Sequence, residues 1–133
     1  YSNEKIIELL EKVRGPFNVN TLSQNVGTLI LKEKDFLRKS IIHNDKWRKI
    51  LPIEIKKIGL ESYESFANFV LIKVNEKKYS KAKILSFLRE KKILVRDLSN
   101  YGMKHFFRVS IGSTSDLKKF LKELRNSINT QNA

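Results

Sequence analysis

Residues 93–112 read ILVRDLSNYGMKHFFRVSIG, and this stretch decides the fold of the chain. It holds two short apolar runs, 93–95 and 106–111, with the turn-forming residues 99–102 between them. Short runs rich in β-branched and aromatic residues that end at turn residues predict strands. We therefore expect two strands here, and a third, largely buried strand over 65–74, where Phe, Val, Leu and Ile predominate.

Helical periodicity surrounds these strands. The pair Gly15-Pro16 ends the first helix, Thr21 is the expected cap of the second, and Pro52 predicts a kink or break in the third. The polar tail 129–133 is expected to fray. The order of elements predicts an α+β fold, in which helices pack on a small mixed or antiparallel sheet and a long helical segment comes first. Apolar residues three or four positions apart predict helices over 3–13, 21–41, 45–57 and 81–88, and one from Ser113 or Thr114 to about 128.

The composition is that of a globular protein without a membrane span. The 133 residues are 41% hydrophobic with five Gly and two Pro, which fits neither a disordered tail nor a fibrous repeat. No apolar run approaches the ~20 residues that cross a bilayer. The absence of Cys excludes disulfides, thiolate metal sites and a cysteine nucleophile. We expect a soluble, cytoplasmic protein. Because the chain begins at Tyr1 in a polar segment that runs directly into a helix, we also expect further sequence to precede it.

The charge of the chain points toward anionic partners. A net charge of +13 and a pI near 10 are compatible with nucleic-acid binding. The lysines, however, are scattered over the whole chain beside apolar positions at helical spacing, as on solvated helix faces. No RNA-binding aromatic motif, zinc-finger spacing or basic region before heptads occurs. A nucleic-acid-binding module therefore stays a disfavoured alternative.

Two arginines form the candidate binding site. Arg96 follows the first apolar run, and Arg108 interrupts the second. A guanidinium group in apolar surroundings needs a partner, and its planar fork suits a carboxylate or a phosphate. Asn100 and Tyr101 lie in the intervening turn and are candidates for lining the same site.

Structural alternatives remain open for each of these residues. Arg96 has an acidic neighbour, Asp97, and would be neutralised by an ion pair with it or with another acid. Arg108 would equally fit a structural ion pair or an exposed strand face. Turn formation explains Asn100 and Tyr101 as well as a site does.

No other constellation predicts catalysis or metal binding. His43 and His105 are far apart, and neither has a His or a carboxylate at metal-ligand spacing. The segment Gly112–Thr114 precedes a helix, whose free N–H groups could hold an anion, but a helix cap is the favoured interpretation. Phosphate loops, nucleophile elbows and zincin helices do not occur.

Five segments, in order along nearly the whole chain, resemble the histidinol-phosphate branch of the fold-type I, pyridoxal-phosphate-dependent aminotransferases. No single segment decides the match, and the last is shared with related aspartate and aromatic aminotransferases. The first segment and the Arg96-Asp97 pair favour the histidinol-phosphate branch. The segments are 13–20, 65–71, 93–97, 101–102 and 107–112.

The resemblance implies a function for a larger parent enzyme. Its small domain closes over a cofactor held by the large domain, so residues 1–20 are expected to end the large-domain segment and residues 21–133 to form the small domain. The residue matching Arg108 grips the phosphate of histidinol phosphate, or the carboxylate of glutamate or 2-oxoglutarate, and the one matching Arg96 helps hold the phosphate.

The catalytic equipment of the family has no match here. It consists of a Schiff-base lysine, an aspartate at the cofactor ring nitrogen and a phosphate cup. We therefore predict no catalytic, cofactor-binding or metal-binding residue in this chain, and no transamination by it alone. The parent enzyme is expected to be a homodimer. The alternatives are another class I or II aminotransferase, for aspartate or aromatic amino acids, and a free-standing domain that binds small anions.

Overall fold

The computed structural model describes residues 2–16 and 18–132, which divide between two units, Tyr1–Lys39 and Ser40–Ala133. Helices α1 (Glu4–Val13) and α2 (Thr21–Ile30) belong to the first unit, and helix α3 (Lys34–Lys57) carries the chain across the boundary. The boundary predicted at residue 20 separates α1 from α2 and stays a prediction.

The first two helices begin at side-chain caps. The side chain of Asn3 accepts a hydrogen bond from the backbone N–H of Ile6 at 3.2 Å, and that of Asn20 accepts one from Ser23 at 2.8 Å. The helix predicted over 3–13 is thus confirmed. The cap expected at Thr21 is wrong by one position, because the asparagine before it provides the acceptor. Phe17, in the predicted connection, lies outside the described residues.

The helices predicted over 21–41 and 45–57 are divided differently. The chain leaves α2 through short-range hydrogen bonds from Lys32 to Leu29 and from Glu33 to Ile30, and α3 then restarts at Lys34. Apolar spacing continues across this turn, which is why the sequence predicts one helix where there are two.

Of the kink or break predicted at Pro52, a break is wrong, since α3 continues through this residue, and a kink stays a prediction. Proline removes one backbone hydrogen bond, but the neighbouring Leu51 and Ile55 are completely buried. Tertiary packing of this kind outweighs local helix propensity.

The second unit contains a four-stranded antiparallel sheet of order β1-β2-β4-β3. Its strands are β1 (Glu61–Tyr63), β2 (Phe69–Lys73), β3 (Arg96–Asp97) and β4 (Phe106–Ser110). The fold class predicted from the sequence, α+β with helices on a small sheet, is confirmed.

The strands differ from the prediction in both number and length. Strand β2 is shorter than the predicted 65–74, because residues 65–68 belong to the connection between β1 and β2. Strand β1 itself was not predicted from the sequence. The apolar run 93–95 is not a strand. Ile93 donates its backbone N–H to Leu88 at the end of the preceding helix, and Ile93 and Val95 pack against the core. Their apolar character reflects packing rather than strand pairing.

Helices α4 (Lys81–Glu90) and α5 (Thr114–Asn132) complete the second unit, as predicted. The fraying expected over 129–133 is wrong as far as 132. Ile128 is buried, and the side chain of Gln131 accepts a hydrogen bond from the backbone N–H of Ser80 at 2.8 Å, so the last turn is held to the start of α4. Ala133 lies outside the described residues.

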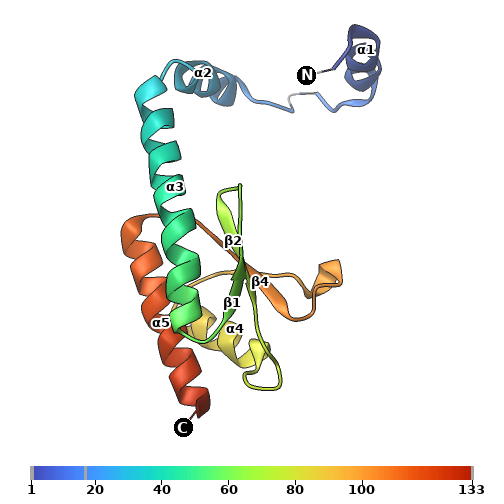
Figure 1. Cartoon of the computed structure of the whole chain (residues 1–133). Coiled ribbons are helices and arrows are strands. Elements are labelled where there is room, and N and C mark those ends of the chain that lie inside the picture. The colour runs from blue at the N-terminus through green and yellow to red at the C-terminus, as the bar shows by residue number, and fades with distance from the viewer. Residues whose placement is uncertain (1, 17, 133) are drawn as a thin grey trace. The chain divides into compact units, whose positions relative to one another are not determined.

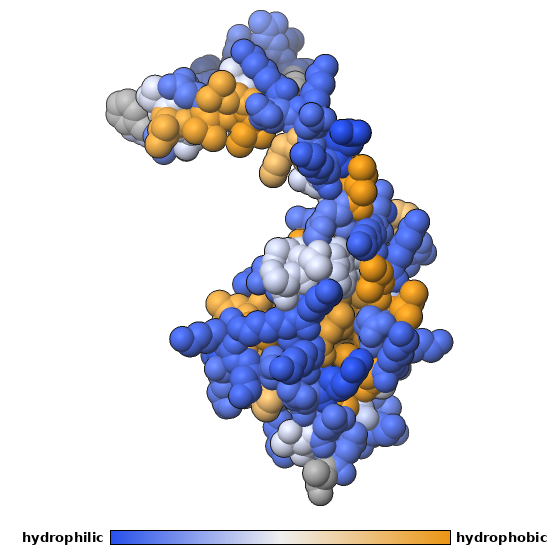
Figure 2. Space-filling view, turned by 90° about the vertical axis from the view of Figure 1, so that its left-hand side faces the viewer, coloured by the Kyte–Doolittle hydropathy of each residue, from blue (hydrophilic) through white to orange (hydrophobic). Residues whose placement is uncertain are grey.

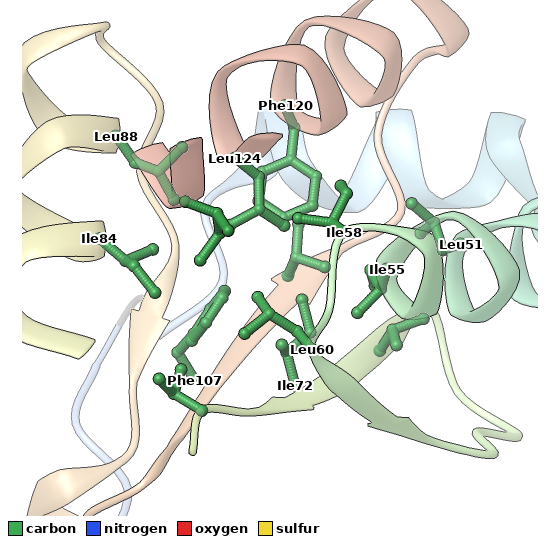
Figure 3. Packing of buried hydrophobic residues seen from close by; sticks show 14 of the residues in the cluster. Leu51, Ile55, Ile58, Leu60, Ile72, Ile84, Leu88, Phe107, Phe120 and Leu124 are labelled. Atoms are coloured by element: carbon green, nitrogen blue, oxygen red, sulfur yellow. The ribbon is translucent and has the colours of Figure 1, made fainter. Parts of the chain in front are cut away.

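One face of the sheet forms the core. Alternate residues of the central strands, such as Ile72 of β2 and Phe107 of β4, are fully buried against α4, α5 and the second half of α3 (Figure 1). Figure 3 shows these two side chains meeting Ile84, Phe120 and others from the helices. The alternation places the residues between them, which are half-buried, on the opposite face.

The N-terminal unit has no such core in the described residues. Neither α1 nor α2 buries a side chain. Figure 2 shows hydrophobic side chains on the surface of this unit. The large hydrophobic residues exposed in this unit are Ile6, Ile7, Leu9, Leu10, Val13, Val19, Leu22, Val26, Leu29, Ile30, Leu31, Phe36 and Leu37. Within residues 2–16 and 18–132, no helix is both long and apolar enough to cross a membrane.

Candidate anion-binding site

The sheet register brings the two predicted arginines together. Arg96 of β3 is the direct cross-strand partner of Arg108 of β4. Directly opposite residues of an antiparallel pair lie about 5 Å apart and project from the same face. Phe107 and Val109 occupy the core face, so both arginines belong to the other face, in one row with Leu71 of β2.

Arg108 has no acidic partner within the part of the chain that the structure describes. Its guanidinium carbon lies 4.5 Å from the centroid of the Phe69 ring, a cation–π contact. Its Nε atom is buried and makes no hydrogen bond to the described residues. An unsatisfied buried donor costs about 1–3 kcal/mol, and more where the group is charged. The donor therefore marks a place where an acceptor from a ligand would be favoured.

Arg96 is exposed and is held by Tyr101. Its Nη2 donates a hydrogen bond to the phenol oxygen of Tyr101 at 3.0 Å, and its guanidinium carbon lies 5.7 Å from the ring centroid. The hydrogen bond and charge of Arg96, together with the charge of Arg108, lower the pKa of Tyr101 below its ordinary value. Three of the four predicted site residues therefore act on one another. The fourth, Asn100, is exposed in the short 3-10 helix η1 (Ser99–Tyr101) that also carries Tyr101.

The ion pair between Arg96 and Asp97, left open by the sequence, does not form. Successive strand residues face opposite sides, and Asp97 instead contacts the buried Nζ of Lys81 at 2.6 Å. That hydrogen bond, followed by one from the backbone of Ser99, lowers the pKa of Asp97 to about 2. Sequence reasoning missed Lys81, because a lysine at the start of a helix carries no local signal of burial.

The arrangement is suited to holding an anion. Two like charges directly opposite on neighbouring strands destabilise a sheet. An anion seated between them would offset this repulsion, and guanidinium forks bind carboxylate or phosphate oxygens in pairs. The two arginines therefore do not belong to a structural ion pair in the described residues, and their anion-binding role stays a prediction.

The other sequence candidates have structural roles. Ser113 caps α5: its Oγ accepts a hydrogen bond from the backbone N–H of Asp116 at 3.2 Å and donates one to the Asp116 carboxylate at 2.6 Å. A carboxylate thus already occupies the start of this helix. His43 Nε2 lies 2.8 Å from the carbonyl oxygen of Gly112, and His105 Nδ1 lies 3.2 Å from a carboxylate oxygen of Glu76.

A surface hollow of about 410 Å³ lies elsewhere, between the start of α4 and the end of α5. Lys77, Lys78 and Lys83 contribute to its lining, and neither arginine does. These lysines are exposed, so their charges are solvated and define no site.

Residues 1–124 match the family model of aminotransferase class I and II, and the chain belongs to this family. The family expected from the five ordered segments is thereby confirmed.

Relatives of known name agree. The chain is 36% identical over 129 residues to the histidinol-phosphate aminotransferase of Desulfotalea psychrophila, covering 97% of this chain and 33% of that protein. It is 41% identical over 116 residues to that of Clostridium novyi, covering 84% and 31%. The chain therefore spans about a third of the length of the curated relatives it matches.

Solved structures show the same fold. The histidinol-phosphate aminotransferase of Clostridium acetobutylicum superposes with a TM-score of 0.85 at 26% identity, covering 96% of this chain and 39% of that one. The Sinorhizobium meliloti enzyme, solved in complex with pyridoxal-5'-phosphate, gives a TM-score of 0.81 at 17% identity, which supports the fold alone.

Proposed function

We propose that this chain is the small-domain portion of a pyridoxal-phosphate-dependent histidinol-phosphate aminotransferase, and that Arg96 and Arg108 hold the acidic group of its substrate. The observation that carries the proposal is the opposed guanidinium pair, in which the buried Nε of Arg108 lacks a partner in the described residues. The names of the relatives support the histidinol-phosphate branch.

The proposed site suits both halves of a transamination. Histidinol phosphate carries a phosphate, whereas glutamate and 2-oxoglutarate carry carboxylates, and a guanidinium fork binds either group. Tyr101 holds Arg96 beside Arg108 before any substrate arrives, so less side-chain freedom is lost on binding. The role of this chain is then to bind and orient the substrate.

The residues of this chain do not fit a pyridoxal phosphate site. Such a site needs a free lysine amine for the Schiff base. Lys81, the one lysine buried among the described residues, has its ammonium group bound by Asp97 and Ser99, and the other described lysines are partly or fully exposed to water rather than held in a closed site. We therefore assign the cofactor to the part of the parent enzyme that this chain does not match, and expect no transamination from the chain alone.

The remaining assignments extend this proposal. Residues 1–20 would end the large-domain segment and the crossover, and residues 21–133 would form the small domain. The exposed apolar side chains of α1 and α2 fit helices that pack against other parts of a larger enzyme. The parent enzyme is proposed to be a cytoplasmic homodimer.

Anion titration tests the proposed site. Isothermal titration of the chain with histidinol phosphate should show binding that is about ten- to a hundredfold weaker in Arg108→Ala, since a hydrogen bond to a charged group contributes roughly 1.5–3 kcal/mol. Arg89→Ala is the matched control, because Arg89 is exposed on α4, and it should bind like the wild type. In the full-length enzyme, Arg108→Ala should raise KM and lower kcat/KM.

Two results would count against the proposal. Equal affinity in Arg108→Ala and the wild type would remove Arg108 from the site. Preference for aspartate or an aromatic amino acid over histidinol phosphate would keep the site but move the chain to another branch of the family.

A further inference from the structure

We propose that Lys81 is a positioning residue for the arginine pair: it ties the turn that carries Arg96 and Tyr101 to helix α4 and keeps Asp97 away from Arg96. The inference rests on the proposed function, in that it explains how the anion-binding pair is held. The observations behind it concern a separate cluster on the core side of β3.

The cluster is a closed set of short hydrogen bonds. The Nζ of Lys81 lies 2.6 Å from Oδ1 of Asp97 and 2.7 Å from Oγ of Ser99. The Ser99 hydroxyl donates to the same Asp97 oxygen at 2.9 Å, and the Ser99 backbone N–H donates to it at 3.0 Å. The ammonium group of one helix thus binds two positions of the turn at once.

Backbone pairing alone gives this turn little support. Strand β3 has two residues and lies at the edge of the sheet. Strands this short contribute few ladder hydrogen bonds. Lys81 binds Asp97 and Ser99. Both lie in the sequence between Arg96 and Tyr101, the hydrogen-bonded pair on the other face of the strand.

A lysine at position 81 is energetically unfavourable unless its charge is paired. It is 5% exposed, and it is the first residue of α4, where the helix dipole disfavours a cation. The hydrogen bonds to Asp97 and Ser99 offset these costs. A local arrangement that opposes propensity and is stabilised by specific partners is typical of functional sites.

Pairing with Lys81 also protects the charge of Arg96. Asp97 is the immediate neighbour of Arg96, and an unengaged carboxylate there would compete with a substrate anion for the guanidinium group. The strand directs Asp97 to the opposite face, and Lys81 holds its carboxylate there. Loss of Lys81 should therefore harm the site more than loss of the Asp97 charge.

The phenol of Tyr101 reports the arrangement without any ligand. We would titrate it by NMR of the ring carbon bonded to oxygen in the wild-type chain and in Lys81→Met, which keeps the apolar stem. The pKa of Tyr101 should return toward its ordinary value in Lys81→Met and be restored in part by Lys81→Arg. Lys83→Met, an exposed site two residues further along α4, should leave it unchanged.

Phosphate affinity gives the second readout. With inorganic phosphate as the probe, Lys81→Met should raise Kd about tenfold, as small misplacements of binding groups do, and Asp97→Asn should raise it less. In an Arg96→Ala background, Lys81→Met should weaken binding no further. Full additivity there would show a general structural effect and overturn the proposal.

The remaining outcomes are equally decisive. An unchanged Tyr101 titration in a folded Lys81→Met chain would overturn the proposal, and so would unfolding of both Lys81→Met and Asp97→Asn. If Tyr101 responds as expected but the wild-type chain binds neither phosphate nor histidinol phosphate, the positioning role stands and the proposed function fails.

Discussion

The helices of the two units show the same apolar periodicity, but the two units bury very different numbers of apolar side chains. In Ser40–Ala133, helices with a 3.6-residue apolar period meet a sheet, and residues such as Leu51, Ile84 and Leu124 lose all contact with water. In Tyr1–Lys39, α1 and α2 have the same period, and none of their side chains is buried. Periodicity therefore shows where a helix has an apolar face, whereas burial depends on whether a partner surface is present.

The largest expected effect contrasts two phenylalanines. Phe107→Ala in β4 should lower the free energy of unfolding by about 3–5 kcal/mol, because it leaves a cavity in the core. Phe36→Ala, at a residue that is 65% exposed in the first unit, should lower it by less than about 0.5 kcal/mol. Urea unfolding followed by the fluorescence of Trp47, the single tryptophan, measures both. Similar losses for the two variants would contradict the contrast between the units.

Two glycines give a smaller difference of opposite sign. Gly59 has φ +92° at the end of α3, so Gly59→Ala should destabilise the second unit by about 1–2 kcal/mol. Gly27 lies inside α2 with nothing within 4 Å of an added Cβ, and Gly27→Ala should favour that helix by about 1 kcal/mol.

Far-ultraviolet circular dichroism should show increased helicity for Gly27→Ala, while the unfolding midpoint seen by Trp47 stays the same. A shift of that midpoint would mean that α2 and the core unfold together, and that the two units are energetically coupled.

The smallest expected effect is a pH dependence in the second unit. The pKa of Asp97 is lowered in the fold from 3.8 to about 2, so its pairing with Lys81 contributes full stability above pH 4 and loses it as the pH falls through 2. Because Asp97 is half exposed, solvent screening limits the contribution to about 1 kcal/mol. Urea unfolding between pH 5 and 2 should show this loss, and Asp97→Asn should reduce it. An equal loss in the variant would assign the acid sensitivity to other carboxylates.

The helices and the two central strands were largely predictable from the sequence, whereas the two edge strands were not. Apolar spacing located α1, α4 and α5, because a helix repeats its pattern over several turns. The edge strands β1 and β3 have only three and two residues, too few to show a period, so the sequence does not reveal β1 and wrongly predicts a strand over 93–95. The break expected at Pro52 does not occur for another reason: the burial of neighbouring residues of α3 outweighs the low helix propensity of proline.

The candidate site was also only partly predictable from the sequence. The sequence singled out Arg96 and Arg108, because a guanidinium group beside apolar residues calls for an anion. It left open whether Asp97 neutralises Arg96, and it gave no indication of Lys81, because both depend on which face of β3 each side chain occupies.

The sequence by itself determined the family, the helical faces and the excess of positive charge, since these follow from residue identity and spacing along the chain. Only the tertiary structure decided that Arg96 lies opposite Arg108 and that Lys81 binds Asp97. Strand register and helix placement join residues 12 and 16 positions apart. Such contacts depend on how the whole core closes, which no local pattern encodes.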